Sequence, residues 1–114
     1  MKNHLINKTE YKKYFDDISK LIKGQQVELE VTGLDIGNQL ETDWVALEGF
    51  SYDPRAEVLV VHTPLLDHGI YHPIEIISAE DGLSITSLSI KDTEEHTHIV
   101  QFRRPLMLES SKAW

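Results

Sequence analysis

The sequence predicts an α+β protein with an N-terminal helix packed on a mostly antiparallel, strongly twisted or barrel-like sheet of five to six strands. Two observations predict this fold. Apolar residues recur every three or four positions over residues 9–23, and from residue 26 they alternate with polar residues in short runs between turn signals. Because 114 residues contain no repeat and no linker, a single domain over residues 1–114 is expected.

The predicted helix, at residues 9–23, carries signals at both ends. Asn7 or Thr9 can accept hydrogen bonds from the first turn, and Gly24 stands where a left-handed residue ends a helix. The apolar stripe that faces the sheet consists of Tyr11, Tyr14, Phe15, Ile18, Leu21 and Ile22.

The β-rich body covers about residues 26–105. Strands are predicted at residues 27–31, 39–50, 58–61, 74–77, 83–91 and 96–103. The second and third strands are expected to form a hairpin, and residues 63–73 to form a loop with a short edge strand. The apolar phase changes near Thr86 and Ser87, which predicts a β-bulge there. Pro105 is expected to end the last strand.

The two tryptophans are predicted to differ in burial. Trp44 falls within a predicted strand and is expected in the core. Trp114 ends the chain and is expected in a short mobile C-terminal tail.

The composition indicates a soluble, cytoplasmic protein. There is no cysteine, so disulfides and thiolate metal sites are excluded, and no apolar run is long enough for a membrane helix. The formal net charge is −8, with an excess of lysines in residues 1–23 and of acidic residues in 24–114. Nucleic acid is therefore an unlikely partner, because its binding depends on Lys and Arg.

Several short patterns occur together in one order along the chain. They are Gly49-Phe50-Ser51-Tyr52-Asp53-Pro54, Glu57-Val58-Leu59, Asp67-His68-Gly69-Ile70, His72-Pro73-Ile74-Glu75-Ile76, Asp81-Gly82-Leu83 and the run from Ile99 to Leu106. In these patterns the chain resembles a family of small bacterial proteins, the domain-of-unknown-function family 5335, and Gly69 stands where a larger apolar residue is usual. The resemblance implies no activity, cofactor or partner.

Common catalytic motifs are absent from the sequence. The stretch from Gly49 to Asp53 lacks the second glycine of a G-x-S-x-G nucleophile elbow, so hydrolysis through an acyl-enzyme is not expected. No glycine-rich phosphate loop is present, so nucleotide binding is not expected either.

The only concentration of groups that could carry chemistry consists of His62, Asp67, His68, His72, His96 and His98. Asp67, His68 and His72 are the candidate catalytic residues, because a carboxylate that holds an imidazole is a recurring acid–base unit. The candidate metal ligands are His68, His72, His96 and His98, where the last two share one face of a strand. The alternative roles are structural: a loop cap for Asp67, an ion pair for His96 and a hydrogen-bonded core position for His98. A cluster that titrates near pH 6 to 7 is a further alternative.

The leading hypothesis is a non-catalytic binding or interaction module without a cofactor. It would bind a protein or self-associate through a sheet edge or the helix face. The alternatives are a metal-binding or acid–base enzyme that uses Asp67, His68 and His72, and a nucleic-acid-binding barrel of the Sm-like type. Convergence of three imidazoles and a carboxylate around one cavity would favour the enzyme.

Overall fold

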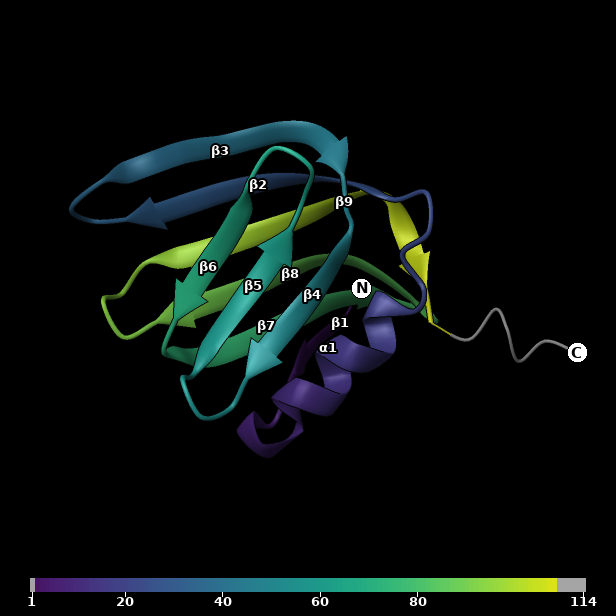
Figure 1. Cartoon of the computed structure of the whole chain (residues 1–114), viewed down its shortest axis with the longest axis horizontal. Coiled ribbons are helices and arrows are strands. Elements are labelled where there is room, and N and C mark those ends of the chain that lie inside the picture. The colour runs from purple at the N-terminus through teal and green to yellow at the C-terminus, as the bar shows by residue number, and fades with distance from the viewer. Residues whose placement is uncertain (1, 109–114) are drawn as a thin grey trace, which may run out of the picture.

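A computed structural model describes residues 2–108, which form two antiparallel sheets and one α-helix (Figure 1). The larger sheet has six strands in the order β1-β7-β8-β9-β2-β3, and the smaller has the order β4-β5-β6. The strands are β1 Lys2–Leu5, β2 Gln26–Gly33, β3 Gly37–Ala46, β4 Gly49–Asp53, β5 Val58–His62, β6 Asp67–Tyr71, β7 Pro73–Asp81, β8 Ser84–Asp92 and β9 Thr97–Met107. The predicted α+β class and the six-stranded antiparallel sheet are confirmed. The sheet is open, so the barrel-like alternative, and with it the likeness to an Sm-type barrel, is wrong.

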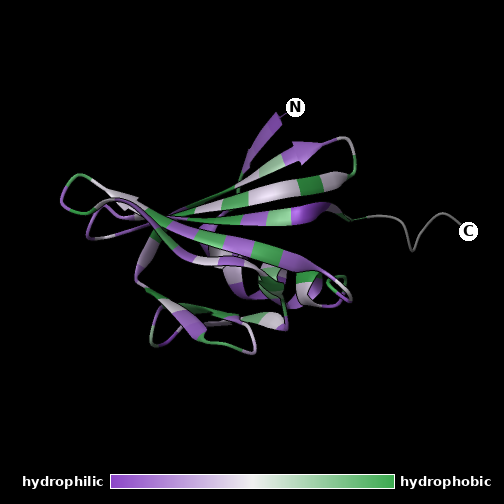
Figure 2. Ribbon diagram, turned by 90° about the horizontal axis from the view of Figure 1, so that it is seen from above, coloured by the Kyte–Doolittle hydropathy of each residue, from purple (hydrophilic) through white to green (hydrophobic). Residues whose placement is uncertain are grey.

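The molecule has two layers. Figure 2 shows the six-stranded sheet as one layer and the smaller sheet facing it. In Figure 1 the helix α1 (Tyr11–Ser19) lies beside β4, in the same layer as the smaller sheet. No helix within residues 2–108 is long and apolar enough to cross a membrane.

The helix is shorter than the predicted span of residues 9–23. Asn7 caps a 3-10 turn at Lys8–Glu10 by accepting a hydrogen bond from the Thr9 amide at 3.0 Å. After Ser19 the chain tightens into turns, and Gly24 has φ of +80° as its position predicted. The Ser19 hydroxyl donates to the carbonyl of Phe50 and accepts from its amide, so α1 covers the outer edge of β4.

The single strand predicted at residues 39–50 is in fact two strands in different sheets. β3 pairs with β2, whereas β4 forms the expected hairpin with β5. The chain crosses from one layer to the other between them, where Leu47 is buried. Trp44 is 36% exposed, and the Arg103 guanidinium lies 5.7 Å from its ring centroid, so the prediction that it is a core residue is wrong. It lies on an edge strand and faces away from the smaller sheet.

The last strand continues past Pro105, contrary to the prediction. Ser87 pairs with Gln101 and Ile85 with Leu106, so residues 102–105 form a bulge opposite Thr86. Proline is tolerated there because no ladder amide is required. The bulge predicted near Thr86 is confirmed, as is the edge strand within residues 63–73. The tail with Trp114 lies outside the described residues.

The core lies between the inner faces of the two sheets and the apolar stripe of α1. Phe15 is fully buried, and its ring lies 5.3 Å from that of Phe50. The inward positions of β8 and β9 are apolar along most of their length and become polar at the end formed by Asp92 and His98. The candidate site begins at this polar end.

Replacing Phe15 with alanine should reduce the free energy of unfolding by about 3 to 5 kcal/mol, because it leaves a cavity where the helix meets both sheets. Urea unfolding followed by circular dichroism measures the change. The matched control is Leu34→Ala, whose side chain is fully exposed and whose loss should cost less than about 0.5 kcal/mol. Equal effects of the two substitutions would contradict this packing of α1.

Candidate functional site

Neighbouring candidate residues of β6 point to opposite faces of the smaller sheet. His68 points inward to the larger sheet, and Asp67 is exposed on the outer face. Successive side chains of a strand alternate in this way. The predicted acid–base unit of Asp67 with His68 is therefore not formed, and each residue has another partner. Asp67 accepts a bond from His62 at 3.1 Å, so it is not a loop cap.

The inward side chains form a chain of hydrogen bonds between the two sheets, which we call the inner relay: Asp92, His98 and His68. His98 Nε2 lies 2.8 Å from Asp92 Oδ2, and His98 Nδ1 lies 2.9 Å from His68 Nε2. Because an ionised carboxylate only accepts, His98 donates from Nε2 to Asp92. The prediction of His98 as a hydrogen-bonded core residue agrees with this geometry.

Asp92 anchors the inner relay as a buried and well-bonded carboxylate. Its Oδ1 accepts the backbone amides of Glu94 at 2.9 Å and His96 at 3.1 Å. Burial alone would raise the pKa of Asp92, but the bonds from His98 and these two amides outweigh it and hold the pKa below its usual value. Asp92 is therefore a carboxylate at neutral pH.

The two histidines of the inner relay cannot both be protonated without losing their mutual bond. Burial and then the neighbouring His98 lower the pKa of His68, while the carboxylate of Glu41 opposes this shift. When both rings are neutral, His68 donates from Nε2 to His98 Nδ1. A single added proton can be shared between them, whereas a second would place two cations at 2.9 Å.

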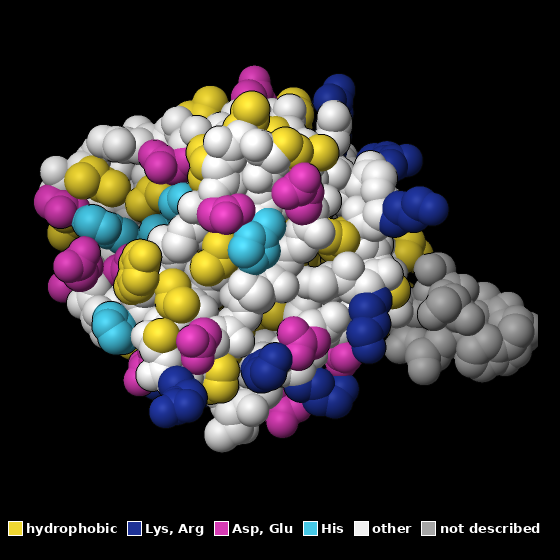
Figure 3. Space-filling model, in the orientation of Figure 1, with side chains coloured by type: hydrophobic (Ala, Val, Ile, Leu, Met, Phe, Trp, Pro, Cys, Tyr) yellow, Lys and Arg dark blue, Asp and Glu magenta, His cyan; other side chains and the backbone are white. Residues whose placement is uncertain are grey.

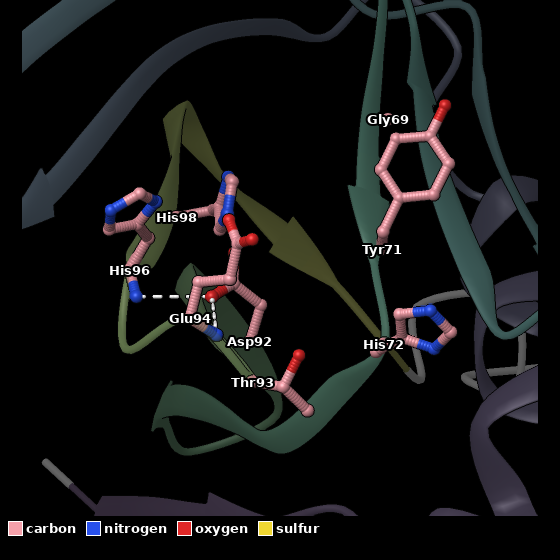
Figure 4. A pocket seen from close by; sticks show the side chains of 8 residues that line it. All are labelled: Gly69, Tyr71, His72, Asp92, Thr93, Glu94, His96 and His98. Atoms are coloured by element: carbon pink, nitrogen blue, oxygen red, sulfur yellow. Dashed lines mark hydrogen bonds and ion pairs between the residues drawn. The ribbon is translucent and has the colours of Figure 1, made fainter.

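The inner relay ends at a cleft of about 370 Å³ between β6 and the turn from β8 to β9 (Figure 4). Its side chains come from both sheets. The lining residues are Gly69, Tyr71, His72, Asp92, Thr93, Glu94, His96 and His98. Three imidazoles and two carboxylates thus share one cavity, although Asp67 lies outside it and His68 only reaches it through His98.

Each of the remaining cleft histidines has a carboxylate within 4 Å. His96 Nε2 lies 2.8 Å from Asp35, which raises the pKa of His96, with a smaller opposing effect of burial. The predicted ion pair of His96 therefore forms, with a partner distant in sequence. His72 lies in the left-handed region at φ of +56°, with its ring nitrogen 3.8 Å from Glu57. Within residues 2–108 no three His or acidic side chains are placed to hold one metal ion, so His68, His72, His96 and His98 do not form a preformed metal site.

Sequence reasoning missed Asp92, although strand periodicity could have found it, and it included His62 among the histidines that could carry chemistry without predicting its partner. Asp92 continues the inward series of Leu88 and Ile90 on β8. His62 lies directly across from Asp67 in the pairing of β5 with β6. The missing information was which strands are neighbours.

The fold and site define an open two-layer β protein whose layers are joined at one end by a buried carboxylate–imidazole chain. The chain belongs to a family of unknown function, DUF5335, whose model matches residues 2–111. It is 36% identical over 109 residues to an uncharacterized protein of Aquifex aeolicus (strain VF5), covering 95% of this chain and 98% of that relative. No solved structure matches the chain significantly.

The stability of the protein should fall in acid because of His68. The pKa of His68 is lower in the folded chain than its ordinary value of 6.5, so the unfolded chain takes up this proton first as the pH falls. The free energy of unfolding should therefore decrease below about pH 6.5. The pKa of His96 is raised in the folded chain, so its contribution to stability has the opposite pH dependence. This contribution is present in acid and is lost as the pH rises. Urea titrations from pH 8 to pH 5 should show a steeper acid loss for the wild type than for His68→Gln, and parallel curves would contradict the assignment.

Replacing Asp92 with asparagine should cost about 2 to 3 kcal/mol of stability, because one of its buried acceptors becomes a donor that faces other donors. Thermal and urea unfolding at pH 7 measure this loss. Asp35→Asn is the control, since it removes an exposed partner of His96 and should cost less than about 1 kcal/mol.

Proposed function

We propose that this chain is an interaction module whose cleft is non-catalytic and binds a basic segment of another protein, with one Lys or Arg side chain inserted. The observation that carries the proposal is the lining of that cleft by the carboxylates of Asp92 and Glu94. A volume of about 370 Å³ is at the lower end of the range for binding sites and suits one side chain.

The charge of the cleft favours a cationic group. Glu94 is exposed and has no ion-pair partner among residues 2–108. The ring of Tyr71 is 66% exposed and lies over Gly69, so it borders the cleft from the outer face of β6. Figure 3 shows His and acidic side chains over the half of this face that holds the cleft, whereas Lys and Arg lie along the lower and right-hand rim.

The cleft meets the criterion stated above for an enzyme, since three imidazoles and a carboxylate share it. Catalysis there is nevertheless less well supported, because the cleft histidines already have partners within the protein. Both ring nitrogens of His98 are bonded, to Asp92 and to His68, so neither is free to contact a substrate. His96 is held by Asp35. The acidic cleft also argues against a nucleic-acid backbone as the ligand.

A short peptide with one central lysine, blocked at both ends, should perturb the amide resonances of Tyr71 and Glu94 in an NMR titration. The same peptide with norleucine should not. Glu94→Gln should weaken binding about fivefold, as expected for the loss of an exposed ion pair of about 1 kcal/mol.

The matched control is Glu48→Gln, which removes an exposed carboxylate outside the cleft and should leave the affinity unchanged. Equal binding of the lysine and norleucine peptides would exclude the proposal. Dimerisation of the free protein in analytical ultracentrifugation that is abolished by Glu94→Gln would instead identify a second copy as the occupant.

A further inference from the structure

A second hydrogen-bonded chain lies on the outer face of the smaller sheet. The Ser51 hydroxyl is 2.8 Å from His62 Nε2, and His62 Nδ1 is 3.1 Å from Asp67 Oδ1. We call Ser51, His62 and Asp67 the outer triad. It is separate from the inner relay, because Asp67 points to the outer face of β6 and His68 points to the inner face.

Strand register places the three residues of the outer triad side by side. His62 pairs with Asp67 across β5 and β6, and with Gly49 across β4 and β5. Ser51 lies two residues beyond Gly49 on the same face of β4, diagonal to His62. Three consecutive strands thus contribute one residue each.

The order of atoms in the outer triad is that of a nucleophile, a base and an orienting acid. A carboxylate accepts, so His62 carries its proton on Nδ1 and donates it to Asp67. His62 Nε2 then accepts the hydrogen of the Ser51 hydroxyl. Both distances fall within the range for an activated nucleophile and its base, and the roles match those of Ser-His-Asp hydrolases.

Apolar side chains lie beside Ser51 on the outer face of the smaller sheet. Val60 is the direct cross-strand partner of Ser51, and Gly69 is the partner of Val60 on its other side. Gly69 has no side chain, and the ring of Tyr71 covers this position, because an added Cβ would lie 3.3 Å from that ring. Val60 and Tyr71 therefore offer apolar contact to a small acyl group near the Ser51 hydroxyl.

We propose that Ser51 is a nucleophile that accepts an acyl group from an activated ester, with His62 as its base and Asp67 as a positioning residue. The oxygen of Ser51 forms a bond to the carbonyl carbon while its proton moves to His62. The bond from that carbon to the leaving oxygen then breaks, and His62 returns the proton to the leaving group, which departs as an alcohol. No redox partner is needed. The side chain of Asp67 is 65% exposed, so its field at His62 is screened and we expect a slow reaction.

The test is covalent labelling of the whole chain with p-nitrophenyl acetate and, separately, with a fluorophosphonate probe. Intact mass and peptide mapping should find one adduct, on Ser51. Ser51→Ala should abolish this adduct, and His62→Gln should slow its formation about 100-fold, the lower end of the usual contribution of a general base. Asp67→Asn should slow it to a smaller degree.

Controls distinguish specific labelling of Ser51 from loss of folding and from effects at the cleft. Ser89→Ala removes a serine from the outward face of the larger sheet, and this variant should label like the wild type. Within the wild-type protein, Ser51 should react at least about 100-fold faster than Ser89, a comparison that needs no variant. Labelling of Ser51 at the rate of Ser89, or unchanged labelling in a folded His62→Gln variant, overturns the proposal. Glu94→Gln should leave labelling unchanged, so failure of the outer triad and failure of cleft binding are distinguishable.

Discussion

Side chains alternate between the two faces of a strand, and at β6 this constraint separates two hydrogen-bonded systems that each contain histidine. Asp67 turns outward to His62, while the next residue, His68, turns inward to His98. Two residues that are adjacent in sequence therefore serve different partners in different dielectric surroundings. A shift of β6 by one residue relative to β5 would exchange these faces and abolish both systems.

The inner relay places polar groups at one end of an apolar core with little loss of stability. Asp92 is buried, yet both of its oxygens accept hydrogen bonds from His98 and from backbone amides. A buried polar group is tolerated when its bonds are complete. The same bonds fix the turn between β8 and β9, so the wall of the cleft depends on the relay. The proposed binding at the cleft and the stability in acid therefore depend on one set of residues.

Much of the fold could be predicted because the periodicity of a helix or strand and the residues that favour a turn are recognisable within short stretches of sequence. The helix stripe at Phe15, the end of its turn at Gly24 and the bulge near Thr86 agree with the structure. The largest error arose where the chain changes layers. The predicted strand at residues 39–50 contains the apolar run from Trp44 to Leu47, and only Glu48 and Gly49 mark the crossing from β3 to β4. The exposure of Trp44 follows from its place on an edge strand, which no local pattern specifies.

The sequence by itself determined the class of fold, the acidic character of the sheet body and the presence of histidines and carboxylates in its second half. Only the tertiary structure decided which of them meet. His98 contacts His68 across thirty positions in the chain, and His96 contacts Asp35 across sixty-one. Such pairings depend on strand order and on the packing of two sheets, and alternation along a single strand carries no information about either.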